Sequence, residues 1–217
     1  GPRRRARRSP PARRRAQSFY DARRDRFLFI GGIDSDSLRH DDVWEWDHAS
    51  GTWSDISPAT GGPDSVTLNF PMTYDSRRDR LIYVNNDAAS QHPVLWFLDL
   101  SVDPPSWSRL EIPASFSISL VGLTRASAAY DSLGDRLFLK LPYPDNGLYV
   151  VDLSNPTGYS SVPTRSYFSL EPRVAVDPVH NRLLLDVDDF DQTPEFALVE
   201  YDLATLDSTE VPVDDLS

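Results

Sequence analysis

A short phrase recurs four times along this chain of 217 residues. In each copy an Asp follows a Tyr or Val, and an Arg lies five positions after that Asp. The starts of the copies are 54, 56 and 46 residues apart, close to the period of about 40 to 50 residues at which some repeat architectures stack their units. The chain is therefore expected to be an array of four similar units. The four copies are Tyr20-Asp21 with Arg26, Tyr74-Asp75 with Arg80, Tyr130-Asp131 with Arg136, and Val176-Asp177 with Arg182.

The apolar runs inside each unit are short. They are four or five residues long, rich in aromatic and β-branched residues, and bounded by Gly, Pro, Asn or Asp. Such runs predict strands rather than helices, because no period of 3.6 residues is sustained. Each unit is thus predicted to hold four strands, a to d, with at most a turn or two of helix elsewhere. In the first unit they are expected at Arg15 to Tyr20, Arg26 to Ile30, Val43 to Asp47, and Thr52 to Ile56.

Further residues of the first unit carry a family resemblance. A Gly pair, Gly31-Gly32, follows strand b, and Trp53 follows Asp47 at a short spacing. With Tyr20 and Arg26 these residues resemble the kelch repeat. The resemblance implies an all-β fold, a β-propeller built of four kelch-like, four-stranded antiparallel blades that form part of a larger propeller. The expected blades are 11–60, 61–113, 114–165 and 166–217, after a basic, disordered head at 1–10.

The Gly pair is not kept in the later units. Glycine at this place lets the backbone reach positive φ and approach another backbone closely. Asn85-Asn86 is expected to substitute in part, because Asn tolerates the left-handed region. Leu141-Pro142 cannot, so the third blade is expected to turn differently there.

With four units, the sequence does not determine how the array of blades closes. The flat apolar faces of the first and fourth blades would lack a neighbour, and exposed sheet faces of this kind are costly. Three outcomes are possible: a compact four-bladed closure, self-association, or a fragment whose remaining blades lie outside these residues. We favour the fragment as the expectation.

The charge of the chain limits the kinds of partner that it can bind. The net charge is −11, and eight of the 22 basic residues lie within the first 15 positions, so the rest of the chain carries 33 acidic residues against 14 basic ones. A body this acidic repels phosphate, so nucleic-acid binding by the folded part is not expected. No stretch is long and apolar enough to span a bilayer and no signal peptide is visible, so a soluble protein with no membrane partner is expected; the compartment is unknown.

The loops between strands b and c vary most in length. The distance from the first Asp to the strand-c Asp is 26, 24, 21 and 25 residues in the four units, whereas the a–b turn is constant. Repeat arrays often place binding residues on the face that receives insertions, so a partner site is expected at the b–c and d–a loops, although any single residue is better explained as a solvated loop position. The expected site residues are Asp34, Asp36, Arg39, His40, Asp41, Asn86, Asp87, Gln91, His92, Tyr143, Asp145, Asn146, Asp188, Asp189, Phe190 and Asp191.

Catalytic and metal-binding motifs are not found. The chain has no cysteine, so it lacks the cross-linked cysteine of the copper oxidases that carry kelch-like repeats. The histidines have no zinc spacing, and the aspartates at 186–191 do not fit the calcium-loop pattern. The repeated Asp and Arg are interpreted as turn-forming groups. No catalytic residue, metal or cofactor is therefore expected.

Three function classes follow from these observations. A non-catalytic protein-interaction module is favoured. The alternatives are a propeller hydrolase, since Asp47 to Trp53 is similar to the Asp-box of sialidases apart from its glycine spacing, and a propeller that binds a small ligand or glycan. Aromatic residues that could stack on a sugar do not favour the glycan-binding propeller, because they lie on the predicted c strands, where burial explains them. These residues are Trp44, Trp46, Trp96 and Tyr149.

Overall fold

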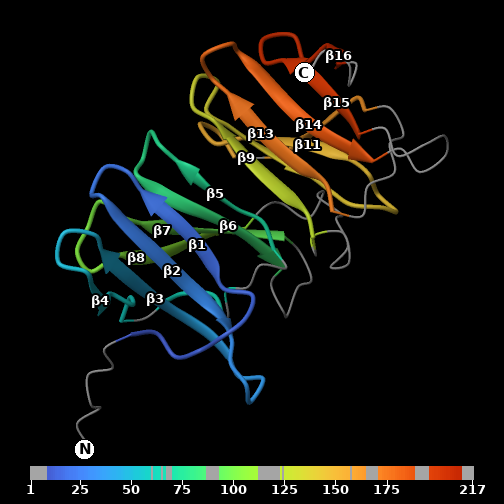
Figure 1. The fold of residues 1–217 in the computed structure, drawn as a ribbon. Helices are drawn as coiled ribbons and strands as arrows, with labels where there is room; N and C mark the ends of the chain where they lie inside the picture. Colours follow the sequence, from blue (N-terminus) through green and yellow to red (C-terminus); the bar gives the residue numbers. More distant parts are fainter. Residues whose placement is uncertain are drawn as a thin grey trace, which may run out of the picture. The chain divides into compact units, whose positions relative to one another are not determined.

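The computed structural model describes residues 9–59, 61–64, 66, 70–86, 93–111, 123, 125–156, 158–164, 171–188 and 196–211. These residues form an all-β fold of four four-stranded antiparallel sheets, and helix is almost absent from them (Figure 1). Each sheet is a meander of consecutive strands, which is the order of a propeller blade. The all-β, blade-type fold class predicted from the repeat is confirmed.

The sheets follow one another along the chain, one per repeat. The first holds β1 (Gln17–Asp21), β2 (Arg26–Ile33), β3 (Arg39–Asp47) and β4 (Thr52–Asp55). The second holds β5 (Met72–Asp75), β6 (Arg80–Asn86), β7 (Pro93–Asp99) and β8 (Ser106–Glu111). The third holds β9 (Ser127–Asp131), β10 (Arg136–Lys140), β11 (Leu148–Asp152) and β12 (Ser160–Val162). The fourth holds β13 (Arg173–Asp177), β14 (Arg182–Asp188), β15 (Phe196–Asp202) and β16 (Ser208–Val211).

Two compact units are formed by these sheets. One comprises Gly1–Leu68 with Phe97–Ser108, and the other comprises Asn69–Trp96 with Arg109–Ser217. The first sheet lies in the first unit, and the third and fourth sheets lie in the second unit. Among the described residues, no helix is long and apolar enough to cross a membrane.

The repeated Asp and Arg build the a–b turn of each sheet. The Asp21 carboxylate accepts hydrogen bonds from the backbone N–H of Arg23 at 3.1 Å and from Nε of Arg26 at 2.9 Å. The residue before the Arg lies in the left-handed region, with φ of 50° at Asp25, and Asp and Asn tolerate that region better than most residues. The structural interpretation of this phrase is confirmed, since the other three turns repeat both features at Asp75, Asp131 and Asp177.

The Gly pair of the first sheet allows a close backbone approach. Gly31 and Gly32 have φ of 64° and 103°, and the N–H of Gly32 donates to the carbonyl of Val66 at 2.7 Å. A Cβ on Gly31 would lie 2.2 Å from that same oxygen. The expectation for the second sheet was wrong: neither Asn85 nor Asn86 has a positive φ, because β6 continues as extended strand through both residues. In the third sheet β10 instead ends at Lys140, just before Leu141.

Strands b and c of the first sheet are longer than predicted. β2 continues to Ile33 and β3 begins at Arg39, so only residues 34–38 form the loop. The pairing continues past a bulge between Ile30 and Gly32, whereas the prediction ended strand b at Ile30 and began strand c at Val43. Arg39, His40 and Asp41 therefore lie on β3 and not in the loop. Asn86 and Asp188 likewise lie at the ends of β6 and β14.

Burial differs between the second and third sheets on the one hand and the first and fourth sheets on the other. In the second and third sheets, consecutive residues of strand b are buried on both faces, at Leu81 and Ile82 and at Leu137 and Phe138. In the first sheet only the face of Leu28 and Ile30 is buried, whereas in the fourth sheet it is the opposite face that is buried, at Leu183 and Leu185. The expectation that the first and fourth blades each lack a neighbour on one face stays a prediction.

A hydrophobic core joins the third and fourth sheets within the second unit. Phe138 and Val150 of the third sheet pack in one cluster with Leu183, Val199 and Tyr201 of the fourth. The Nη2 of Arg136 also donates to the carbonyl of Leu203 at 2.6 Å. Adjacent repeats are thus held both by apolar side chains and by arginines of the a–b turns.

Candidate functional site

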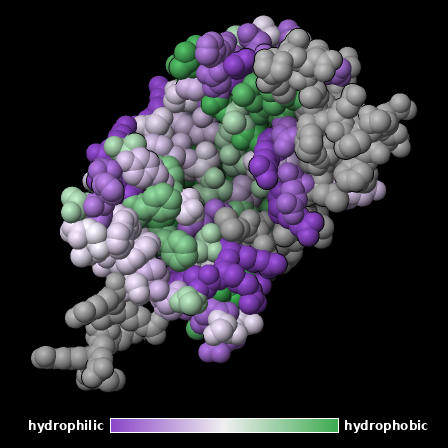
Figure 2. Space-filling model, in the orientation of Figure 1, coloured by the Kyte–Doolittle hydropathy of each residue, from purple (hydrophilic) through white to green (hydrophobic). Residues whose placement is uncertain are grey.

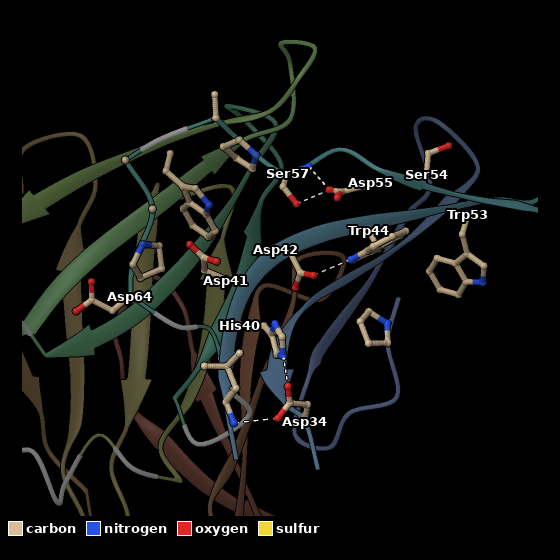
Figure 3. A pocket seen from close by; sticks show the side chains of 18 residues that line it. Asp34, His40, Asp41, Asp42, Trp44, Trp53, Ser54, Asp55, Ser57 and Asp64 are labelled. Carbon is tan, nitrogen blue, oxygen red and sulfur yellow. Dashed lines mark hydrogen bonds and ion pairs between the residues drawn. The ribbon is translucent and has the colours of Figure 1, made fainter. Parts of the chain in front are cut away.

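A pocket of about 1200 Å³ opens in the first unit. It lies where the end of the β2–β3 hairpin meets the connection that follows β4 (Figure 3). These are the b–c and d–a segments of the first repeat, the kinds of segment that the loop lengths indicated. The lining residues are Pro11, Asp34, Leu38, His40, Asp41, Asp42, Trp44, Trp53, Ser54, Asp55, Ser57, Pro58, Ala59, Gly61, Gly62, Pro63, Asp64 and Trp107.

Two of the lining carboxylates have partners that fix their position. Asp34 contacts Nε2 of His40 at 3.0 Å and accepts from the backbone N–H of Leu38 at 2.9 Å. Desolvation opposes ionisation of Asp34, but the contact with His40 and the backbone hydrogen bonds from Leu38 and Asp36 together outweigh it, so the pKa of Asp34 is lowered. This pair shapes the loop at the lower end of the pocket in Figure 3.

Asp42 is held more firmly. It accepts from Nη2 of Arg13 at 3.0 Å and from the indole Nε1 of Trp44 at 2.8 Å. Burial works against the charge of this carboxylate, yet the hydrogen bonds from Arg13 and Trp44 lower its pKa. Because Arg13 neutralises Asp42, this residue contributes rigidity to the pocket rather than free charge.

Three further carboxylates leave the pocket acidic. Asp55 accepts a hydrogen bond from the hydroxyl of Ser57 at 2.5 Å, and this contact does not neutralise the charge of the carboxylate. Asp41 and Asp64 are exposed, and neither has a hydrogen-bond or ion-pair partner within the described part of the chain. Carboxylates without a cationic partner attract cations and accept hydrogen bonds from ligands. The charge available to a ligand therefore lies mainly on Asp41, Asp55 and Asp64.

Indole rings supply the apolar part of the lining. Trp44 is buried, whereas Trp53 and Trp107 are half-buried. The backbone of Gly62 lies against the Trp107 ring, because a Cβ on Gly62 would come within 2.7 Å of the indole Cδ1. The chain thus approaches the Trp107 ring closely at Gly62, and the pocket combines flat aromatic surfaces with carboxylates.

Only part of the predicted site meets here. Asp34, His40 and Asp41 line the pocket, whereas Asp36 and Arg39 are exposed and do not. Tyr143, Asp145 and Asn146 lie in the loop between β10 and β11, where Asp145 accepts from the hydroxyl of Tyr149 at 2.9 Å. The side chains of Asn86 and Asp188 are not described. Asp87, Gln91, His92, Asp189, Phe190 and Asp191 lie outside the described residues.

Several lining residues were missed by the sequence reasoning. Asp42, Trp44 and Trp53 were assigned to strands or left out, and the connection from Ser57 to Asp64 was named only as a d–a loop. The run of Pro and Gly at 58–63 was the available signal, because such a run can lie flat against a neighbouring ring. No comparable signal indicated Trp107, which comes from β8.

No group of three or more His, Asp and Glu side chains in the described ranges is placed to hold a metal ion. The His40 imidazole contacts Asp34, a carboxylate that is already bonded to the backbone of its own loop. The arrangement is one that can bind a ligand through charge, hydrogen bonds and ring stacking.

Comparisons with known proteins show the fold. No family model matches this sequence, and no curated protein matches it. The structure of YjhT matches with a TM-score of 0.57 and 11% identity, covering 90% of this chain and 68% of its own. An auxiliary nutrient binding protein from Bacteroides ovatus ATCC 8483 matches with a TM-score of 0.55 and 10% identity, covering 91% of this chain and 41% of its own. The chain thus belongs to the all-β, propeller-like class of folds.

Proposed function

We propose that this chain is a non-catalytic binding module of kelch type, and that the pocket of the first unit is its binding site. The observation that carries the proposal is a pair of carboxylates, Asp41 and Asp64, that have no partner among the described residues and lie in a pocket also lined by Trp107. Pockets with a few convergent polar groups among aromatic side chains are the usual sites for ligands. The lining comes from the end of the β2–β3 hairpin, from β4 and the d–a connection that follows it, and from Pro11 and Trp107.

The chemistry of the lining favours a cationic group. Five aspartates line the pocket, and His40 is the one basic side chain among the lining residues. An ammonium or guanidinium can bond to a carboxylate and lie over an indole face at once. The ligand is therefore a Lys or Arg side chain presented by a partner protein, which enters the pocket while the partner backbone contacts the loops.

A carbohydrate is the second candidate. Sugars stack on indole rings and donate hydroxyl hydrogen bonds to carboxylates, and both groups are present. The likeness to an auxiliary nutrient binding protein supports a small-ligand site without naming the ligand. This candidate does not require a net positive ligand, which separates it from the first.

Isothermal titration calorimetry with a hexalysine peptide tests the first candidate. We expect saturable binding that weakens at least about tenfold when Asp41 and Asp64 are both changed to Asn, since each loses a charge-assisted hydrogen bond. The control is the double change Asp103→Asn and Asp207→Asn, which removes the same charge from exposed positions outside the pocket. Equal weakening in both variants would show general attraction to an acidic body and would refute the assigned site.

A second titration uses neutral oligosaccharides. Binding of an oligosaccharide that quenches tryptophan fluorescence, together with no saturable hexalysine binding, would replace the first candidate by the second. A Trp107→Phe variant then loses most of the quenching, because the stacking ring is smaller. No response to either probe would leave the pocket without the proposed function.

A further inference from the structure

The arginine-rich head of the chain, defined here as residues 3–8, joins the folded part beside the pocket. The described residues begin at Ser9, after the head, and Pro11 is one of the residues that line the pocket. Figure 2 shows hydrophilic side chains at the end of the first sheet where the β2–β3 hairpin projects. The head therefore adjoins an acidic site. Its basic residues are Arg3, Arg4, Arg5, Arg7 and Arg8.

Arg13 fixes the place where the head leaves the folded part. Its side chain is fully buried, and it donates from Nε to the carbonyl of Pro11 at 3.1 Å and from Nη1 to the carbonyl of Gly31 at 2.8 Å. The next residue, Arg14, exchanges two backbone hydrogen bonds of 2.8 Å with Ile33. The segment that follows the head is thus tied to the end of β2, and Pro11 is held at the pocket.

One arginine of this N-terminal segment already pairs with a carboxylate of the pocket. Arg13 donates to both oxygens of Asp42, and its guanidinium lies 5.9 Å from the centre of the Phe29 ring. A planar guanidinium can bind a carboxylate at two points and lie over an aromatic face at the same time. The pocket therefore offers the kind of contact that an arginine close to Pro11 can use.

The remaining carboxylates of the pocket match the charge of the head. Asp41 and Asp64 are exposed and have no partner among the described residues, and no Arg or Lys is among the residues that line the pocket. Beyond the first 15 positions the chain carries 33 acidic residues against 14 basic ones. The head is thus the part of this chain whose charge is most complementary to the pocket.

The short tether favours this chain's own head over a free cationic ligand. Arg8 and Arg7 lie three and four residues before Pro11, and three to four extended residues span about 10 to 14 Å. A short flexible tether gives its end an effective concentration in the millimolar range. A head that binds the pocket only weakly is therefore enough to occupy it, and a partner at lower concentration has to compete with it.

We propose that the arginine-rich head binds in the pocket of its own chain, with its guanidinium groups against Asp41 and Asp64, and that a cationic partner must displace it. This inference rests on the proposed function, because it names the regulation of the same site. The head is an internal competitor that lowers the apparent affinity of the pocket for a partner's Lys or Arg side chain.

Disulfide trapping tests where the head binds. The chain has no cysteine, so a pair of introduced thiols can react only with each other. Ala6→Cys keeps every arginine of the head, and it is combined with Ala59→Cys in the pocket lining or, as the control, with Ala49→Cys. Ala49 is equally exposed but lies in the turn between β3 and β4, outside the lining.

The pair at positions 6 and 59 should form an intramolecular disulfide at least about tenfold faster than the control pair, because a bound head holds the two thiols close together. Mass spectrometry of the oxidised chain and a non-reducing gel measure the rate and distinguish crosslinks within one chain from crosslinks between chains. Equal rates for the two pairs would overturn the proposal. Crosslinks that form only between chains would also overturn it, since they would place the head in the pocket of another copy.

Calorimetry with hexalysine tests the competition. Arg7→Gln with Arg8→Gln should tighten hexalysine binding at least about threefold, because the competitor is weakened. Arg125→Gln with Arg173→Gln removes the same charge from exposed positions outside the pocket and should change the affinity by less than about 1.5-fold. Equal tightening in both variants would report net charge alone and would overturn the proposal. The two failures are distinguishable: absence of hexalysine binding in every variant refutes the proposed ligand, whereas the crosslinking rates decide on the head.

Discussion

Arg78 and Asp135 form a two-point ion pair between the a–b turns of the second and third sheets. The guanidinium Nη1 and Nη2 lie 2.7 and 2.6 Å from the two carboxylate oxygens, and Nη1 of Arg78 also lies 3.1 Å from Asp75 of its own turn. Asp75, the repeated Asp of the second sheet, therefore closes its own turn and also orients Arg78 toward the third repeat.

Removing this arginine should destabilise the protein measurably. Arg78→Met is expected to lower the free energy of unfolding by about 2 kcal/mol, because a largely buried carboxylate loses a bidentate charged partner. Urea denaturation followed by circular dichroism measures the change. Glu171→Gln is the control, since its contact with Arg125 is 3.9 Å long and exposed, and a change within about 0.5 kcal/mol is expected. Equal effects would contradict the role given to Arg78.

Lowering the pH should remove the contribution of Asp135 to the free energy of unfolding. The hydrogen bond from Arg78 is the largest influence on this carboxyl and, against desolvation, it lowers the pKa of Asp135 from 3.8 to about 2. The folded state then holds fewer protons than the unfolded state between these values, so stability is lost as the pH falls through them. The unfolding free energies of the wild type and of Arg78→Met should converge from pH 4 toward pH 2. Parallel curves would be inconsistent with this linkage.

Lys140 should make stability depend on pH on the alkaline side. This side chain is buried and its ammonium donates to the carbonyl of Asn146. Burial lowers the pKa of Lys140 from 10.5 to about 8, so the unfolded state holds more protons above pH 8 and stability rises with pH there. From pH 8 to 9.5 the expected rise is about 1 to 2 kcal/mol.

Lys140→Met provides the comparison for this rise. The variant cannot titrate at this position, so its unfolding free energy should not rise between pH 8 and 9.5. The range ends at 9.5 because burial raises the pKa of Tyr130, whose linkage lowers stability only at higher pH. A rise of the same size in the variant would exclude Lys140 as its source.

Two glycines allow a matched test of the close backbone approach at Gly31. Gly31→Ala is expected to cost about 2 to 4 kcal/mol, because Gly31 has φ of 64° and its new Cβ would meet the carbonyl of Val66 at 2.2 Å. Gly158→Ala has no atom within 4 Å of its new Cβ and should change stability by less than about 1 kcal/mol. Thermal denaturation of both variants distinguishes them, and similar losses would refute the close-approach role of Gly31.

Most of the fold was available from the sequence because the repeat is local. The Asp and Arg of each a–b turn hydrogen-bond within six residues, so their spacing alone predicts the turn and the two strands beside it. The ends of strands b and c were less accessible. Extension of β2 past Gly32 depends on pairing with His40 across a bulge at Gly31. A glycine within a strand can mark such a bulge, but the Gly pair was interpreted only as a place of close backbone approach.

The candidate site was only partly predictable for a related reason. Asp34 and His40 are close in sequence and were assigned to one loop region. Trp107 reaches the same pocket from β8, and its approach depends on the path of the chain around Gly62. Such a meeting of distant segments is a property of the folded backbone, which residue types and spacing do not specify.

Hydrogen exchange measured by mass spectrometry, with and without the hexalysine peptide, tests most directly the claim that this pocket is the binding site. The account predicts slower exchange in peptides that cover residues 34–42 and 57–64, and unchanged exchange in the loop at 141–147 of the third sheet. Protection confined to 141–147, or spread evenly over the acidic surface, would contradict it.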